Sequence, residues 1–126
     1  GYDVVYQVAA KTGLGVFEAA KELGEGHYVV GCDIDQSPLL PGQVVGSQIT
    51  PYDTWVYAAM KDYAEGKFEG GRTEAFSMKR TDGAGFDFDS TGKITYKDGV
   101  KDMVEESKEK IMSGEIVPES VREKDK

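Results

Sequence analysis

Two short apolar runs near the N-terminus each lead directly into small or acidic residues. The first begins at Asp3 and runs into the segment Lys11-Thr12-Gly13; the second begins at Tyr28 and runs into Cys32-Asp33-Ile34-Asp35. Between them, about Gly13–Leu23, apolar side chains recur at the spacing of one helical face. Strand, helix and strand in this order form one unit of a parallel α/β sheet, in which ligands sit at the carboxyl ends of the strands.

The pattern continues with a third strand and a second long helix. Gln43–Ile49 is expected to form the strand, and the helix is expected to run from about Tyr52 to Ala64, with Thr50 as its cap. We expect this helix to bury its apolar residues against the sheet, namely Tyr52, Trp55, Val56, Ala59 and Tyr63. The first 68 residues therefore predict one ligand-binding lobe of βαβ-β-α order.

The character of the chain changes after Gly70 and Gly71. Arg72–Met78 is expected to form a strand, and Phe86–Tyr96 is expected to form a hairpin. A last helix is predicted to stop at Gly114, before the charged tail 118–126. We interpret residues 69–126 as a segment that crosses toward a second lobe.

Composition excludes several classes of function. The 126 residues carry a net charge of −8, which disfavours nucleic acid, because nucleic-acid binders need clustered Lys and Arg. No apolar run is long enough to span a bilayer. Because residues 1–5 enter a strand at once, we expect the segment to belong to a longer protein.

Asp33 and Asp35 lie where the second strand ends, at the ligand edge of the sheet. A carboxylate there accepts hydrogen bonds from hydroxyl groups and suits the vicinal diol of a sugar. The same residues would also serve as a turn cap and a solvated side chain. Asp-x-Asp further raises a metal-dependent nucleotide-sugar enzyme as an alternative, although no additional ligand cluster supports a metal.

Two further features face the same edge. Thr12 and Gly13 open the first helix, where free backbone amides favour an oxygen-rich ligand, although helix packing explains the glycine equally well. Trp55, near the start of the next helix, would stack on a flat ring or pack in the core. The sequence shows no nucleophile–base pair, zinc spacing or phosphate loop, so we expect neither catalysis nor a cofactor.

Several stretches resemble the basic membrane lipoprotein family, which comprises nucleoside-type substrate-binding proteins of ABC importers. The similarity covers nearly the whole chain in the right order. The stretches that carry it are Gly1–Lys21, Val30–Ser37 with its Gly-Cys-Asp-Ile-Asp-Gln string, Pro41–Ser47, Gly66–Phe68 and Lys110–Ile116.

The resemblance implies a fold of the type I periplasmic-binding-protein kind, with two lobes that close around a purine nucleoside. It also implies an N-terminal lipid anchor outside the cytoplasmic membrane and an ABC permease as partner. In the family, the ribose-binding aspartate lies in the string matched by Asp33. A family glycine pair matches Ala10 and Lys11, and a family lysine matches Thr50; these three residues depart from the pattern.

The sequence thus predicts an extracytoplasmic substrate-binding component of an ABC importer, without catalysis. The expected ligand is a small polar molecule with a ring, with purine nucleosides or bases first and sugars second. The alternatives are a sensory ligand domain of a regulator on the same fold and the Asp-x-Asp enzyme. The ligand-binding residues predicted are Asp33, Ala10, Lys11, Thr12, Gly13, Thr50 and Trp55.

Overall fold

The computed structural model of the chain describes residues 1–73, 78 and 84–118. Its internal contacts divide it into two units, Gly1–Thr95 and Tyr96–Lys126. The two units are considered separately below.

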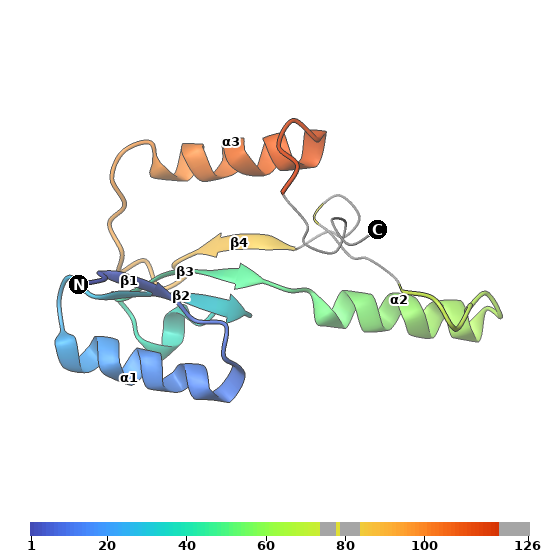
Figure 1. Cartoon of the computed structure of the whole chain (residues 1–126), viewed down its shortest axis with the longest axis horizontal. Helices are drawn as coiled ribbons and strands as arrows, with labels where there is room; N and C mark the ends of the chain where they lie inside the picture. The colour runs from blue at the N-terminus through green and yellow to red at the C-terminus, as the bar shows by residue number, and fades with distance from the viewer. Residues whose placement is uncertain (74–77, 79–83, 119–126) are drawn as a thin grey trace. The chain divides into compact units, whose positions relative to one another are not determined.

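The first unit is built on a four-stranded sheet in the order β1-β2-β3-β4 (Figure 1). Strands β1 (Val4–Tyr6), β2 (Tyr28–Asp33) and β3 (Val44–Ile49) run parallel. Strand β4 (Gly85–Phe88) joins the far edge antiparallel to β3. The predicted α/β class with a mostly parallel sheet is confirmed.

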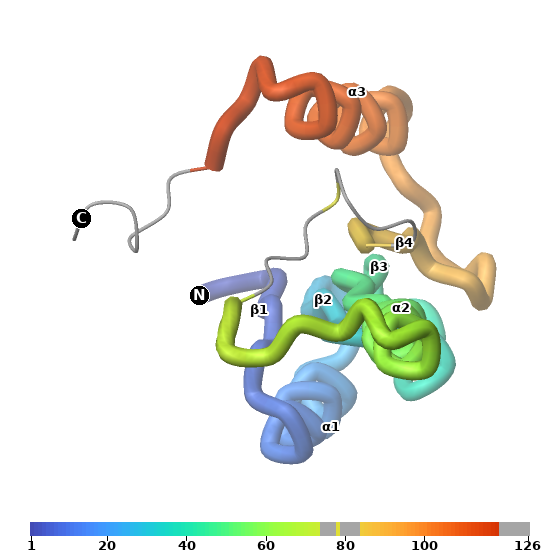
Figure 2. The backbone as a smooth tube through the Cα atoms, turned by 90° about the vertical axis from the view of Figure 1, so that its right-hand side faces the viewer, coloured from blue at the N-terminus to red at the C-terminus, as the bar shows by residue number. Residues whose placement is uncertain are grey.

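Helix α1 (Leu14–Leu23) forms where the apolar spacing predicts it, preceded by the short 3-10 helix η1 (Ala10–Gly13). Both views place α1 on one side of β1 and β2 (Figures 1 and 2). Its inner face and the strands form a small core. The buried apolar residues of this core are Phe17, Ala20, Val29 and Val44, with Val16 and Leu40 packed against them.

The side chain of Gln43 links the C-terminal end of α1 to the strands. The Nε2 of Gln43, just before β3, lies 2.8–3.0 Å from the carbonyl oxygens of Ala20, Gly24 and His27. These are carbonyls at the end of α1 and in the turn into β2, and those of Ala20 and Gly24 also accept from the backbone amides of Gly24 and His27. Gln43 therefore fixes the end of the helix to the start of two strands.

Helix α2 (Tyr52–Ala64) has the predicted bounds, but the predicted burial of its apolar face is wrong. None of its residues is buried, and Tyr52, Val56 and Tyr63 are 53%, 61% and 72% exposed. Apolar spacing predicts which face of a helix prefers burial, but it does not supply the surface that covers it. Thr50 does not cap the helix either, because Pro51 occupies the cap position and no side chain bonds the first turn.

The segment after Gly71 differs from the prediction in part. Most of the predicted strand Arg72–Met78 lies outside the described residues, as does the tail from 119. The predicted hairpin at Phe86–Tyr96 is wrong, because only β4 forms there. Beyond it, the Asp89 carboxylate accepts bonds from the backbone amides of Thr91, Lys93 and Ile94, which turns the chain without a second strand.

The second unit contains helix α3 (Val100–Ser113). It ends as predicted at Gly114, which adopts the left-handed conformation with φ 87°. Val104 and Ile111 are half-buried, while Met103 is exposed.

A buried polar network ties the loops of the first unit together. Gln7, which is 4% exposed, donates from Nε2 to the Oε1 of Gln36 at 2.8 Å. The same Oε1 accepts from the Cys32 amide at 2.9 Å, and the Gln36 amide donates to the buried Ser47 hydroxyl at 3.0 Å. Gly13 fits against Gln7 so closely that a Cβ there would lie 1.9 Å from its Oε1.

Because this network is buried, removing Gln36 should be costly. Gln36→Ala leaves the Nε2 of Gln7 and the Cys32 amide without an acceptor, and we expect it to lower the free energy of unfolding by about 2–4 kcal/mol. Gln7→Ala should lower it by about 1–3 kcal/mol. The double variant should fall short of the sum by about 1 kcal/mol, measured by urea denaturation. Strict additivity would show that the two glutamines do not act as one unit.

Candidate functional site

The three parallel strands bring their carboxyl ends to one edge of the sheet. The segments that follow them are η1 after β1, the loop from Ile34 after β2, and Thr50 with α2 after β3. The predicted site residues all belong to these segments or to the last residue of β2. This edge is where an open α/β sheet binds its ligand.

Asp33 is the last residue of β2. Its φ of 71° lies in the left-handed region, which is rare for a residue other than glycine. The Ile34 amide donates to the Cys32 carbonyl at 2.9 Å, so Asp33 is the central residue of a γ-turn of the rare, strained form. The Thr50 amide bonds the Asp33 carbonyl at 2.9 Å and holds this conformation.

The Asp33 carboxylate receives hydroxyl donors from the segment after β3. Its Oδ1 accepts from the Thr50 hydroxyl at 3.1 Å and from the Tyr52 hydroxyl at 3.2 Å. Thr50 in turn accepts from the Gln48 Nε2 at 2.8 Å, and the Gln48 Oε1 accepts from the Tyr6 hydroxyl at 3.4 Å. This is a directed chain of donors across the sheet edge that ends on Asp33.

Tyr6 begins this chain as a neutral donor. Partial burial raises the pKa of Tyr6, and the hydrogen bond and charge of Cys32 and the charge of Asp33 raise it further. The Cys32 thiol donates to the Gln48 Oε1 as well, at 3.6 Å. Gln48 is therefore the relay between the donors of β1 and β2 and the hydroxyl of Thr50.

Asp35 has a structural role instead. Its carboxylate accepts from the Ser37 amide at 2.9 Å and from the Ser90 hydroxyl. Partial burial raises the pKa of Asp35, but the bonds from Ser90 and Ser37 together outweigh that effect and leave the pKa below its usual value. The carboxylate thus caps the turn at Ser37 and joins it to the segment after β4.

The predicted residues of η1 have separate roles. Ala10 adopts a left-handed φ of 47°. Thr12 donates from its hydroxyl to the Ala9 carbonyl at 2.6 Å, and Gly13 is buried against Gln7. Lys11 is exposed.

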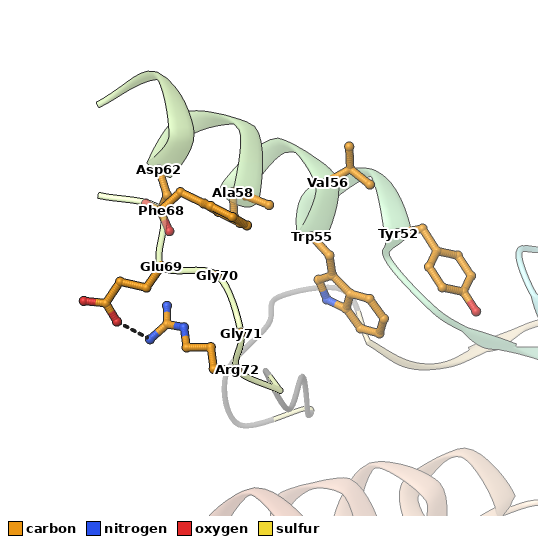
Figure 3. A pocket seen from close by; sticks show the side chains of 11 residues that line it. Tyr52, Trp55, Val56, Ala58, Asp62, Phe68, Glu69, Gly70, Gly71 and Arg72 are labelled. Atoms are coloured by element: carbon orange, nitrogen blue, oxygen red, sulfur yellow. Dashed lines mark ion pairs between the residues drawn. The ribbon is translucent and has the colours of Figure 1, made fainter. Parts of the chain in front are cut away.

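Trp55 is half-buried and lies beside Tyr52, with ring centroids 5.4 Å apart at 78°. Both rings line a groove of about 390 Å³ between α2 and the returning segment 68–72 (Figure 3). Phe68 lies on the returning segment, where Arg72 pairs with Glu69 at 3.3 Å. Tyr52 therefore connects the groove to Asp33, since its hydroxyl reaches that carboxylate.

Of the predicted site residues, Asp33 and Thr50 are joined by a hydrogen bond. Trp55 is linked to them through Tyr52, which packs against Trp55 and bonds Asp33. Sequence reasoning missed Gln48 and Tyr6 as members of the site. The available signal was that Gln48 interrupts a small, apolar strand close to its carboxyl end.

In the described part of the chain, no group of three or more His, Cys, Asp or Glu side chains could hold a metal ion. None of its helices is both long and apolar enough to cross a lipid bilayer.

An α/β lobe that presents a carboxylate and hydroxyl donors at its strand ends is typical of proteins that bind small ligands. The profile of the family described as "ABC transporter substrate-binding protein PnrA-like" matches residues 1–121. The chain belongs to this family. The family comprises substrate-binding proteins, not enzymes, which agrees with the expected lack of catalysis.

Among curated relatives, the chain is similar to Basic membrane protein D of Borreliella burgdorferi, with 39% identity over 99 residues. That match covers 78% of this chain and 29% of the relative. A second relative, Basic membrane protein C of the same species, is 41% identical over 69 residues, covering 54% of this chain and 20% of the relative. The chain thus spans less than a third of the length of these proteins.

Among solved structures, the chain resembles a solute-binding protein of an ABC transporter system from Aeropyrum pernix K1. The TM-score is 0.75 at 27% identity, over 97% of this chain and 42% of that one. A transcriptional activator of the comK gene from Bacillus halodurans gives a TM-score of 0.74 at 23% identity, over 93% and 39%. At that identity the second likeness shows the shared fold alone.

Ala10 provides a direct test of the strain in η1. Because φ of 47° suits glycine better than alanine, we expect Ala10→Gly to raise the free energy of unfolding by about 0.5–1 kcal/mol. Ala9 has an ordinary φ of −139°, so Ala9→Gly should instead destabilise by a similar amount. Thermal denaturation of both variants measures the difference, and a loss of stability in Ala10→Gly would contradict the assignment of strain.

Proposed function

We propose that this chain forms part of the ligand site of an extracytoplasmic substrate-binding protein that delivers a nucleoside-like ligand to an ABC importer. Membership in the substrate-binding family supports the transport role. The observation that carries the ligand class is the Asp33 carboxylate, held in a strained turn at the ligand edge of the sheet. Strained backbone of this kind clusters at functional sites.

The chemistry around Asp33 suits a ligand that donates hydrogen bonds. Within the described part of the chain, the donors to Asp33 are the hydroxyls of Thr50 and Tyr52, and both reach Oδ1. Oδ2 accepts no bond from these residues and is available to a ligand hydroxyl. A charge-assisted bond of this kind contributes about 1.5–3 kcal/mol.

The aromatic groove suits a flat ring next to that hydroxyl. Tyr52 lines the groove, packs against Trp55 and also bonds Asp33, so it connects the aromatic groove to that carboxylate. The volume of about 390 Å³ is within the range of small-ligand sites. A sugar at Asp33 and a base toward Trp55 is the arrangement that we propose, with purine nucleosides or bases first and simple sugars second.

The rest of the pocket is proposed to come from a second lobe. We assign residues 1–68 to the ligand-binding lobe and residues 69–126 to the segment that crosses to the other lobe. The exposed apolar side chains of α2, such as Tyr57 and Met60, fit a surface that a longer protein covers. We further propose that a lipid anchor holds the full-length protein outside the cytoplasmic membrane and that an ABC permease receives the ligand. The proposal includes no cofactor or metal, and it assigns Lys11 as a cation that contacts the ligand.

The regulator alternative rests on the fold shared with the transcriptional activator structure. Fold alone does not determine function. The relatives that share sequence over most of this chain are basic membrane proteins, which favours the importer.

Asp33 gives the sharpest test. In the protein at its natural length, Asp33→Asn keeps the shape of the side chain and tolerates the left-handed φ, so the fold should persist. We expect calorimetry to show at least about tenfold weaker binding of inosine or adenosine, because the ligand loses a charged acceptor. Unchanged affinity would exclude Asp33 from the site.

Asp35→Asn is the matched control, since it removes the same charge two residues away. The Asp35 carboxylate is bonded by Ser37 and Ser90, so this variant should lose stability but keep its affinity for nucleosides.

If no nucleoside, base or sugar raises the melting temperature of the wild-type protein, the proposed ligand class is wrong.

A further inference from the structure

The two oxygens of the Asp33 carboxylate are unequal. Oδ1 accepts two hydrogen bonds, from the hydroxyls of Thr50 and Tyr52. In the described part of the chain, Oδ2 accepts none. Each carboxylate oxygen has about two lone-pair positions, so the protein itself saturates Oδ1.

This inequality matters for a ligand with two neighbouring hydroxyls. A carboxylate binds both hydroxyls of a vicinal diol when each of its oxygens accepts a hydrogen bond from one hydroxyl, which requires both oxygens to be free. Here Thr50 and Tyr52 occupy one of the two positions. Thr50 is itself fixed by the Gln48 amide at 2.8 Å, so its hydroxyl proton is directed at Asp33.

We propose that Thr50 and Tyr52 determine specificity, because they restrict Asp33 to a single ligand hydroxyl at Oδ2. The proposal rests on the proposed function and deepens it. The site takes molecules that present one hydroxyl donor at this position, and it accepts a nucleoside that lacks the other ribose hydroxyl about as well as the ribonucleoside.

The position of Tyr52 strengthens this argument. Its ring packs edge-on against Trp55, with centroids 5.4 Å apart, and lines the groove, while its hydroxyl reaches Asp33. Tyr52 is thus held at both ends. A ligand hydroxyl that displaced it from Oδ1 would exchange one hydrogen bond for another of the same kind, with no net gain.

The test compares adenosine with 2′-deoxyadenosine and 3′-deoxyadenosine by calorimetry on the protein at its natural length. For the wild type, at least one deoxynucleoside should bind within about threefold of adenosine, because the hydroxyl that it lacks makes no bond to Asp33. In Tyr52→Phe, which keeps the ring, Oδ1 regains a free position. The preference for adenosine over that deoxynucleoside should then rise to about tenfold, the value of one charge-assisted bond.

Tyr57→Phe is the control, because Tyr57 lies on the same helix, is 71% exposed and makes no bond to Asp33. It should leave the ratio of affinities unchanged. A ratio within each variant does not depend on small changes in stability, so a structural role alone would not alter it.

The outcomes separate the two proposals. If adenosine binds and both deoxynucleosides bind wild type at least about tenfold more weakly, Asp33 grips both hydroxyls and this inference is overturned. An unchanged ratio in Tyr52→Phe also overturns it. If none of the three nucleosides binds the folded wild type, the proposed function fails first.

Discussion

The hydrogen bond between Gln7 and Gln36 is the interaction on which the ligand edge depends. It joins the loop after β1 to the loop after β2, and Gln36 extends it to Cys32 and Ser47. A buried amide network is stable only when all its members are satisfied, so the loops have little freedom to rearrange. The left-handed turn at Asp33 follows one residue after Cys32, and this fixed backbone holds its strain.

Above this network, the candidate site is a series of hydrogen bonds from neutral donors that ends at the Asp33 carboxylate. Tyr6, Gln48 and Thr50 pass hydrogen bonds toward Asp33, and Tyr52 adds a second hydroxyl. At Thr50 the chain thus places a hydroxyl, not a cation, beside the carboxylate. The proposed ligand donates a further hydrogen bond to the same carboxylate.

The sequence predicts the parallel sheet, α1 and the bounds of α2 well, because apolar spacing and glycine stops are local signals. It fails where a partner surface matters: the apolar face of α2 is exposed, and the hairpin after Phe86 is replaced by a turn around Asp89. It also identifies Asp33 but not Gln48 or Tyr6. Their roles arise from the register between strands, which pairs Cys32 with Gln48 and cannot be inferred from one strand alone.

We propose that Asp33 binds a ligand hydroxyl through one oxygen, and a crystal structure of the protein at its natural length with bound adenosine would show this directly. We expect one ribose hydroxyl within about 2.5–3.0 Å of Asp33 Oδ2, with Thr50 and Tyr52 still on Oδ1 and the base beside Trp55. A ligand that contacts both oxygens, or that lies away from Asp33, would contradict it.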